Sequence, residues 1–140
     1  MDTNYEIRKV KATKDTLVNV LAKEGEKDFL SKLHSSGKTK YRARVIAGMM
    51  EKVARFSTDW AIQAKKLKQL TSDVSVFELR ADGKVIRVMT YLHDDEQRTP
   101  IYLFDFDGHQ GKGGHIKKSD LARAKKLASL ARGCMMGGTE

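Results

Sequence analysis

Two arginines placed in strand-like sequence are the first residues that could do chemistry. In the stretch "FELRADGKVIRVMTY", Arg80 and Arg87 each interrupt an apolar run, and Asp82-Gly83 between the runs is typical of a two-residue β-hairpin turn. A guanidinium group stays charged and offers a planar fork of N–H donors, which suits phosphate. We therefore expect both arginines to stabilise negative charge on a phosphate. The alternative is that Arg87 only pairs with Glu78 across the strands.

The glycine-rich segment "GHQGKGGHIKK", residues 108–118, holds the candidate groups for proton transfer. His109 and His115 carry imidazoles that titrate near neutral pH, and Lys112 lies between them. Such groups could take up and give a proton beside a phosphate that fixed positive charge holds. Tyr91 is expected to stack on a base or to hydrogen-bond a phosphate. The alternatives are a surface loop whose histidines contact solvent, and simple packing for Tyr91.

The charge balance favours a polyanionic partner. Lys and Arg total 27 against 18 Asp and Glu, which gives a formal net charge of +9. Lysine contacts to phosphate position a protein on RNA without reading its sequence. Each lysine taken alone fits a solvated helix face better than a phosphate contact. As a set, we expect these lysines to bind RNA: Lys65, Lys66, Lys68, Lys117, Lys118, Lys125 and Lys126.

Several other classes of protein are not expected. Cys134 is the one cysteine, so the sequence predicts no disulfide framework and no Cys-x-x-Cys metal site. The spacing of His93, His109 and His115 is poor for zinc, and we expect neither a metal nor a small-molecule cofactor. No stretch approaches the roughly 18 apolar residues that span a membrane, and the first residues lack the apolar core of a secretory signal. The cytoplasm is the expected location.

Hydrophobic spacing predicts the elements that hold these residues. Residues 38–56 place apolar side chains on one helical stripe with Lys and Arg opposite, which indicates an amphipathic helix. The run after Asp15 fits a buried strand, although a helical turn fits nearly as well. With one proline and no linker, residues 1–140 are expected to form a single domain. The remaining expectations are a helix from residue 27 to 34, strands at 76–81, 85–91 and 99–107, a last helix at 120–132, a basic arm or short strand at 1–15, and a frayed tail at 133–140.

Alternation along the predicted hairpin assigns its two faces. Pairing outward from the turn sets Arg80 opposite Val85 and Glu78 opposite Arg87. The apolar face then fits beneath the helices. The other face, which carries both arginines and Tyr91, is expected to be uncovered and to form the active surface.

An ordered series of short motifs resembles the RelE/ParE superfamily of bacterial toxins, and its HigB-type, phage-associated branch in particular. The series contains "LKQL", a strand with "FELR", the turn "DGK", a strand with "IRV", an apolar strand that ends at Phe106, a Lys-rich segment and the helix start "SDLARAKKLA". The similarity covers roughly residues 16 to 132. The family pattern has a shorter, denser Lys segment before the last helix than residues 107–118, and residues 1–15 have no counterpart in it.

This resemblance implies a fold and a function. The implied fold is α+β, a small antiparallel sheet of about four strands with an N-terminal helical hairpin packed on one face and a C-terminal helix. The implied function is that of a type II toxin, a ribosome-dependent mRNA endoribonuclease that a cognate antitoxin neutralises, with mRNA and ribosomal RNA as partners. Two alternatives remain open, a ParE-like inhibitor of DNA gyrase and a basic RNA-binding module without chemistry.

Overall fold

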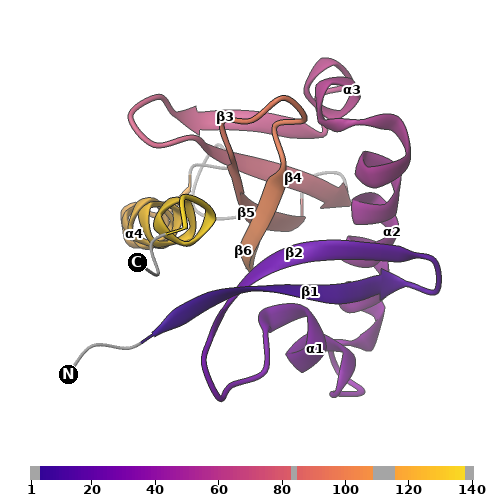
Figure 1. The fold of residues 1–140 in the computed structure, drawn as a ribbon. Coiled ribbons are helices and arrows are strands. Elements are labelled where there is room, and N and C mark those ends of the chain that lie inside the picture. The colour runs from indigo at the N-terminus through magenta and orange to yellow at the C-terminus, as the bar shows by residue number, and fades with distance from the viewer. Residues whose placement is uncertain (1–3, 83–84, 109–115, 138–140) are drawn as a thin grey trace.

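A computed structural model describes residues 4–82, 85–108 and 116–137. These residues form an α+β fold with a mixed sheet of six strands in the order β1-β2-β6-β5-β4-β3 (Figure 1). The elements, in chain order, are β1 (Tyr5–Thr13), β2 (Thr16–Lys23), α1 (Phe29–His34), α2 (Lys40–Phe56), α3 (Thr58–Gln63), β3 (Leu67–Thr71), β4 (Val76–Asp82), β5 (Ile86–Leu92), β6 (Pro100–Asp107) and α4 (Lys118–Met135).

The sheet has one parallel junction, between β2 and β6, while its other neighbours pair antiparallel. The chain leaves β2, forms three helices and three strands, and returns as β6 beside β2. A parallel pair needs such a long crossover because a tight turn can join only antiparallel strands. The junction is short, since only Asn19 with Ile101 and Val20 with Tyr102 are paired.

One face of the sheet is covered by α1, α2 and α3. The apolar stripe of α2, which includes Ile46, Met50 and Val53, packs on the strands in a continuous core. An ion pair fixes the start of α2, because Arg42 Nε lies 2.7 Å from Asp105 Oδ2 on β6. The amphipathic helix that the sequence predicts is confirmed. Its apolar stripe packs on the central strands of the sheet.

The opposite face is covered by α4, which forms a second core. Ala124, Leu127, Ala128 and Ala131 are buried against the strands, and Figure 1 shows the helix lying across the sheet on the side away from α2. The Arg123 guanidinium lies over the Phe104 ring, 4.1 Å from its centroid. The sheet is therefore enclosed on both faces.

The predicted fold is wrong in strand number, in strand direction and in the place of the helices. The sheet has six strands and is mixed, two strands precede the first helix, and the helices α1 to α3 lie mid-chain. The two additional strands, β1 and β3, are edge strands with mostly half-exposed or exposed side chains. Edge strands of this kind lack the clear apolar alternation from which a strand is predicted.

The predicted pairing within the β4–β5 hairpin is also wrong, by two residues. The Val85 N–H donates to Asp82 O over 2.9 Å, so the turn lies one residue later than expected, and the ladder is irregular between Arg80 and Asp82. As a result Arg80 lies opposite Arg87, and Glu78 lies opposite Met89. A shift of two residues keeps each side chain on its original face.

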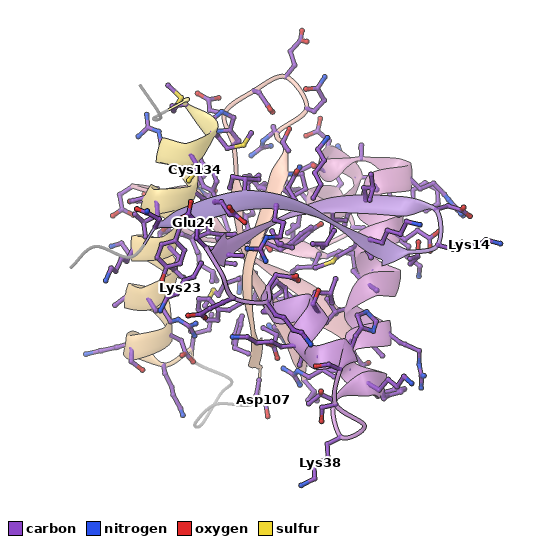
Figure 2. The ribbon with its side chains drawn as sticks, turned by 60° about the horizontal axis from the view of Figure 1, so that its bottom comes forward. Lys14, Lys23, Glu24, Lys38, Asp107 and Cys134 are labelled. Carbon is purple, nitrogen blue, oxygen red and sulfur yellow. The ribbon has the colours of Figure 1, made fainter. Side chains whose placement is uncertain are left out.

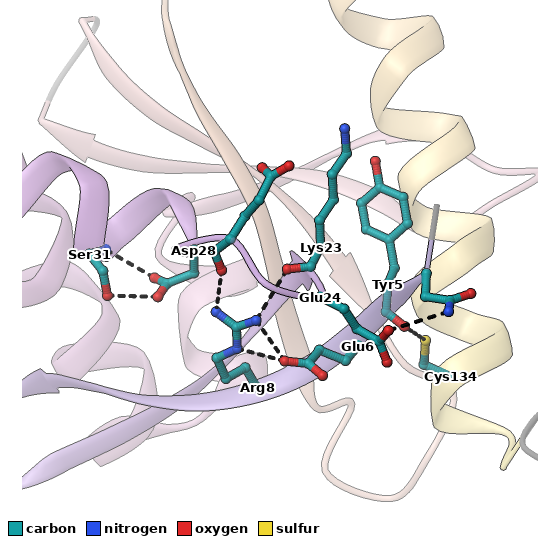
Figure 3. Close-up of polar contacts among 10 residues, drawn as sticks. Tyr5, Glu6, Arg8, Lys23, Glu24, Asp28, Ser31 and Cys134 are labelled. Carbon is teal, nitrogen blue, oxygen red and sulfur yellow. Dashed lines mark hydrogen bonds and ion pairs between the residues drawn. The ribbon is translucent and has the colours of Figure 1, made fainter. Parts of the chain in front are cut away.

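Arg8 ties the N-terminal strand to the turn before α1 (Figure 3). It pairs with Glu6 at 2.6 Å on its own strand, and it donates to the carbonyl oxygens of Lys23 and Glu26 at 3.2 and 2.7 Å. Asp28 then caps α1, accepting from the backbone N–H of Ser31. These contacts hold β1 against β2 at the edge of the sheet.

No helix in the described ranges is both long enough and apolar enough to cross a membrane.

Candidate nucleic-acid interface

Arg80, Arg87 and Glu78 form one cluster on the face that α4 covers. The two arginines are direct partners across β4 and β5. Like charges at directly opposed positions destabilise a sheet, and here a shared carboxylate compensates them. Glu78 Oε2 accepts from Arg80 Nε at 3.1 Å and from Arg87 Nη1 at 2.6 Å. We call these three residues the Arg–Glu–Arg cluster.

The cluster is largely enclosed. The side chains of Glu78, Arg87 and Arg80 are 3%, 13% and 31% exposed. The expectation that the arginine-bearing face is uncovered is therefore wrong, because the C-terminal helix packs on that face instead of lying beside it. Arg80 is the member of the cluster that solvent reaches most readily.

The ion pair of Glu78 with Arg87 is the alternative that the sequence left open, and it is present; what the sequence reasoning missed is that Glu78 also pairs with Arg80. Among the described residues nothing donates a hydrogen bond to its buried Oε1 atom. A buried acceptor left without a donor costs about 1–3 kcal/mol, so Oε1 is an unused acceptor within the described part of the chain. The signal available in the sequence was a carboxylate two residues before Arg80 in an otherwise apolar strand.

A basic hollow adjoins the cluster at the outer edge of the sheet. It encloses about 410 Å³ and is lined by Lys65, Lys68 and Arg80 over an apolar base of Ile62 and Leu67. Lys68 pairs with Glu78 in the ladder, so its side chain leaves the sheet on the same face as the cluster. Three cations around one hollow can hold an anionic group such as a phosphate.

The other predicted lysines lie elsewhere. Lys66 is half-buried, and its carbonyl accepts from the Arg80 N–H at 2.8 Å. Lys117, Lys118 and Lys126 are exposed, the first two at the start of α4. Lys125 pairs at 3.0 Å with Asp73, in the turn at the opposite end of β4 from Arg80, and this contact lowers the pKa of the Asp73 carboxyl.

Tyr91 lies apart from the Arg–Glu–Arg cluster. It is four residues along β5 from Arg87, about 13 Å at the usual rise of a strand. Its hydroxyl hydrogen-bonds His93 Nδ1 at 2.9 Å, and burial raises the pKa of Tyr91. The residue packs in the core beneath α4, which is the alternative that the sequence left open.

The predicted proton-transfer residues His109, Lys112 and His115 lie outside the described residues. The segment that carries them begins at Gly108, whose N–H donates to Val85 O over 2.7 Å beside the β4–β5 turn. It therefore leaves the sheet at the end of β5 nearest Arg87. Within the described ranges no group of three His, Cys, Asp or Glu side chains is placed to hold a metal.

No family model, no curated protein and no solved structure matches this chain. The resemblance to RelE/ParE toxins stays a prediction. Function has to be argued from the cluster, the basic hollow and the charge of the chain.

Proposed function

We propose that this protein is a metal-independent endoribonuclease that cuts mRNA on the ribosome, the toxin of a type II pair. The observation that carries the proposal is the Arg–Glu–Arg cluster, in which no described residue donates to Glu78 Oε1, next to a basic hollow. The motif series and the net charge of +9 support an RNA substrate. A ribosomal target requires the cytoplasm, and a cognate antitoxin is the expected protein partner.

In this proposal Glu78 acts as the base. Its Oε1 takes the proton of the ribose 2′-OH while the 2′ oxygen attacks the adjacent phosphorus. Arg80 and Arg87 stabilise the additional negative charge of the pentavalent phosphorane. The bond from phosphorus to the 5′ oxygen then breaks, leaving a 2′,3′-cyclic phosphate, and the leaving oxygen takes a proton from His109, His115 or Lys112. Substrate binding has to expose Glu78, because its side chain is 3% exposed.

That low exposure favours a second candidate function, RNA binding without cleavage. A guanidinium that is 13% exposed and bonded to a buried carboxylate is an ordinary structural ion pair. In this case Arg87 and Glu78 hold the hairpin together. Lys65, Lys68 and Arg80 then bind phosphates at the basic hollow.

One experiment separates the two functions. Purified protein is added to a translating extract with a defined mRNA, and the mRNA is mapped by primer extension. We expect cuts that require translation and that fall about a hundredfold or more in Glu78→Gln and in Arg80→Ala. Arg44→Ala is the matched control, because Arg44 is an exposed arginine on α2, away from the cluster, and its loss should leave the cuts unchanged.

Intact mRNA together with salt-sensitive binding to a labelled RNA oligonucleotide would support the second function. Intact mRNA without RNA binding would contradict both functions. Each variant is checked for a native thermal unfolding transition, so that loss of cutting is not loss of folding.

A further inference from the structure

A second cavity lies on the other side of the molecule from the Arg–Glu–Arg cluster's face. It encloses about 420 Å³ between the C-terminal end of α2, α3 and the first residues of β2 and β6. The cavity exists because the parallel pairing of β2 with β6 begins only at Asn19 and Ile101. Pro100 opens β6 and has no N–H to continue the ladder, so the two strands part at that point.

The base of this cavity carries a hydroxyl without a partner. Tyr102 is 1% exposed and lines the cavity with the apolar side chains of Met50 and Val53. No hydrogen bond joins its hydroxyl to a described residue, and the hydroxyl is not among the fully buried polar atoms that lack a partner, so it faces the open space of the cavity. Burial raises the pKa of Tyr102, so the hydroxyl stays protonated and can both donate and accept.

The mouth of the cavity is acidic, in contrast to the chain as a whole. Asp59 and Glu96 lie on its rim, and both are exposed. Arg98 lies 3.6 Å from Asp59, an exposed contact that compensates little of this charge. In a protein with a net charge of +9, a local excess of carboxylates selects a cationic partner.

The cavity adjoins a second hollow of about 410 Å³ beside α2 that shares Leu17 and Ala54 with it, and we call the two together the groove. The second hollow adds the carboxylates of Asp15 and Glu51, and it also holds Arg55, whose guanidinium lies 3.8 Å from Glu51 in an exposed contact. Leu17 is 58% exposed, and Phe56 at the end of α2 is 52% exposed. Two adjoining hollows that share an exposed leucine suit an extended polypeptide better than one compact small molecule.

We propose that this groove binds a segment of a partner polypeptide that inserts one apolar side chain above Tyr102 and carries Lys or Arg on either side of it. The apolar anchor fills the space over Met50 and Val53. A polar group of the segment satisfies the Tyr102 hydroxyl. Its basic residues face Asp59 and Glu96 at one end and Asp15 and Glu51 at the other. This interaction is independent of the ribonuclease proposal.

The test is a selection from a displayed library of random 12-residue peptides on the immobilised protein. The same selection is run on Ala54→Arg, which places a large cation in the shared wall of both hollows at an exposed position. We expect the wild type to enrich peptides with an apolar residue flanked by Lys or Arg, and Ala54→Arg not to enrich them. Selected peptides are then measured by fluorescence anisotropy against charge variants.

Glu96→Lys should weaken binding of a selected peptide at least tenfold, and Glu24→Lys should not. Glu24 is the matched control, because it is an exposed glutamate just beyond the other end of β2, next to Lys23 and far from Lys14 (Figure 2). Tyr102→Phe should weaken binding severalfold while leaving the fold intact. Enrichment of the same peptides by Ala54→Arg, enrichment of acidic peptides, no enrichment, or self-association that Glu96→Lys abolishes would each overturn the proposal.

Discussion

Arg87 Nη1 lies 2.6 Å from Glu78 Oε2, and the contact runs diagonally between β4 and β5 because Glu78 is paired with Met89 in the ladder. The diagonal arises from the position of the turn, one residue later than expected, which brings the two arginines to directly opposed positions. One carboxylate then serves two guanidinium groups. The hairpin therefore depends on a charge network as well as on its apolar face.

Arg87→Ala should lower the free energy of unfolding by about 2–4 kcal/mol, because it leaves a buried carboxylate with one cationic partner. Urea unfolding at pH 7 measures this change. Arg55→Ala is the matched control, since the Arg55 contact with Glu51 is exposed and 3.8 Å long, and its loss should lower the free energy of unfolding by less than about 1 kcal/mol. Equal effects of the two substitutions would show that the cluster contributes no more than a surface pair.

The central elements could be predicted from the sequence, whereas β1 was expected only as one of two alternatives and β3 was not expected as a strand. The hydrophobic patterns of α2 and β6 are recognisable in the sequence, because each element packs on a large apolar surface. In β1 only Ala12 is buried, and in β3 only Leu67, so these strands are defined by their neighbours β2 and β4 and not by their own hydrophobicity. The helix α4 was expected, but its position over the second face of the sheet could not be predicted, because short alanines form most of its buried side.

The candidate site was partly accessible to sequence reasoning. Alternation placed Arg80 and Arg87 on one face of the hairpin, and that assignment depends only on parity along each strand. The role of Glu78 as a shared partner depends on the exact register, which a one-residue change in the turn shifted by two. The hollow beside Lys68 depends on β3 and could not be anticipated without that strand.

Asp95 should stabilise the protein near neutral pH and lose this effect in acid. The hydroxyl and the backbone N–H of Thr99 donate to its carboxylate at 2.7 and 2.9 Å, and these bonds lower the pKa of Asp95 below its ordinary value of 3.8. A lowered pKa in the folded state means that the stabilisation is complete above about pH 5 and is lost as the pH falls below 4 and through the folded-state pKa.

Asp95→Ala should therefore lower the free energy of unfolding by about 1 kcal/mol at pH 7 and by much less at pH 2.5. Urea unfolding at both pH values measures this change. Asp94→Ala is the matched control, because Asp94 is exposed, and it should show little effect at either pH. A cost for Asp95→Ala that is unchanged at pH 2.5 would mean that the charge of Asp95 contributes nothing.

Two tyrosines that differ in their hydroxyl partners should respond differently to loss of that hydroxyl. Tyr91→Phe removes the 2.9 Å hydrogen bond to His93 and should lower the free energy of unfolding by about 1 kcal/mol. Tyr102→Phe removes a hydroxyl with no partner among the described residues and should change stability by less than about 0.5 kcal/mol. Thermal and urea unfolding compare the pair, and a larger loss in Tyr102→Phe would indicate an internal partner for its hydroxyl.

The basic hollow predicts a specific change in the salt dependence of RNA binding. If Lys65 and Lys68 each neutralise one phosphate, the double variant Lys65→Ala, Lys68→Ala should reduce the slope of log K against log salt by about 1.4 for single-stranded RNA. Fluorescence anisotropy with a labelled 12-nucleotide RNA over a range of salt concentrations gives the slope.

Lys38→Ala is the matched control for this measurement. Lys38 projects into solvent from the segment between α1 and α2 (Figure 2), and it lines none of the hollows described above. Its removal should leave the slope within about 0.3 of the wild-type value, since an isolated exposed lysine releases few counterions on binding. An equal fall in the slope of log K against log salt for Lys38→Ala would mean that RNA binding depends on the net charge of +9 and not on particular lysines. An unchanged slope in the double variant would remove the hollow from the RNA interface.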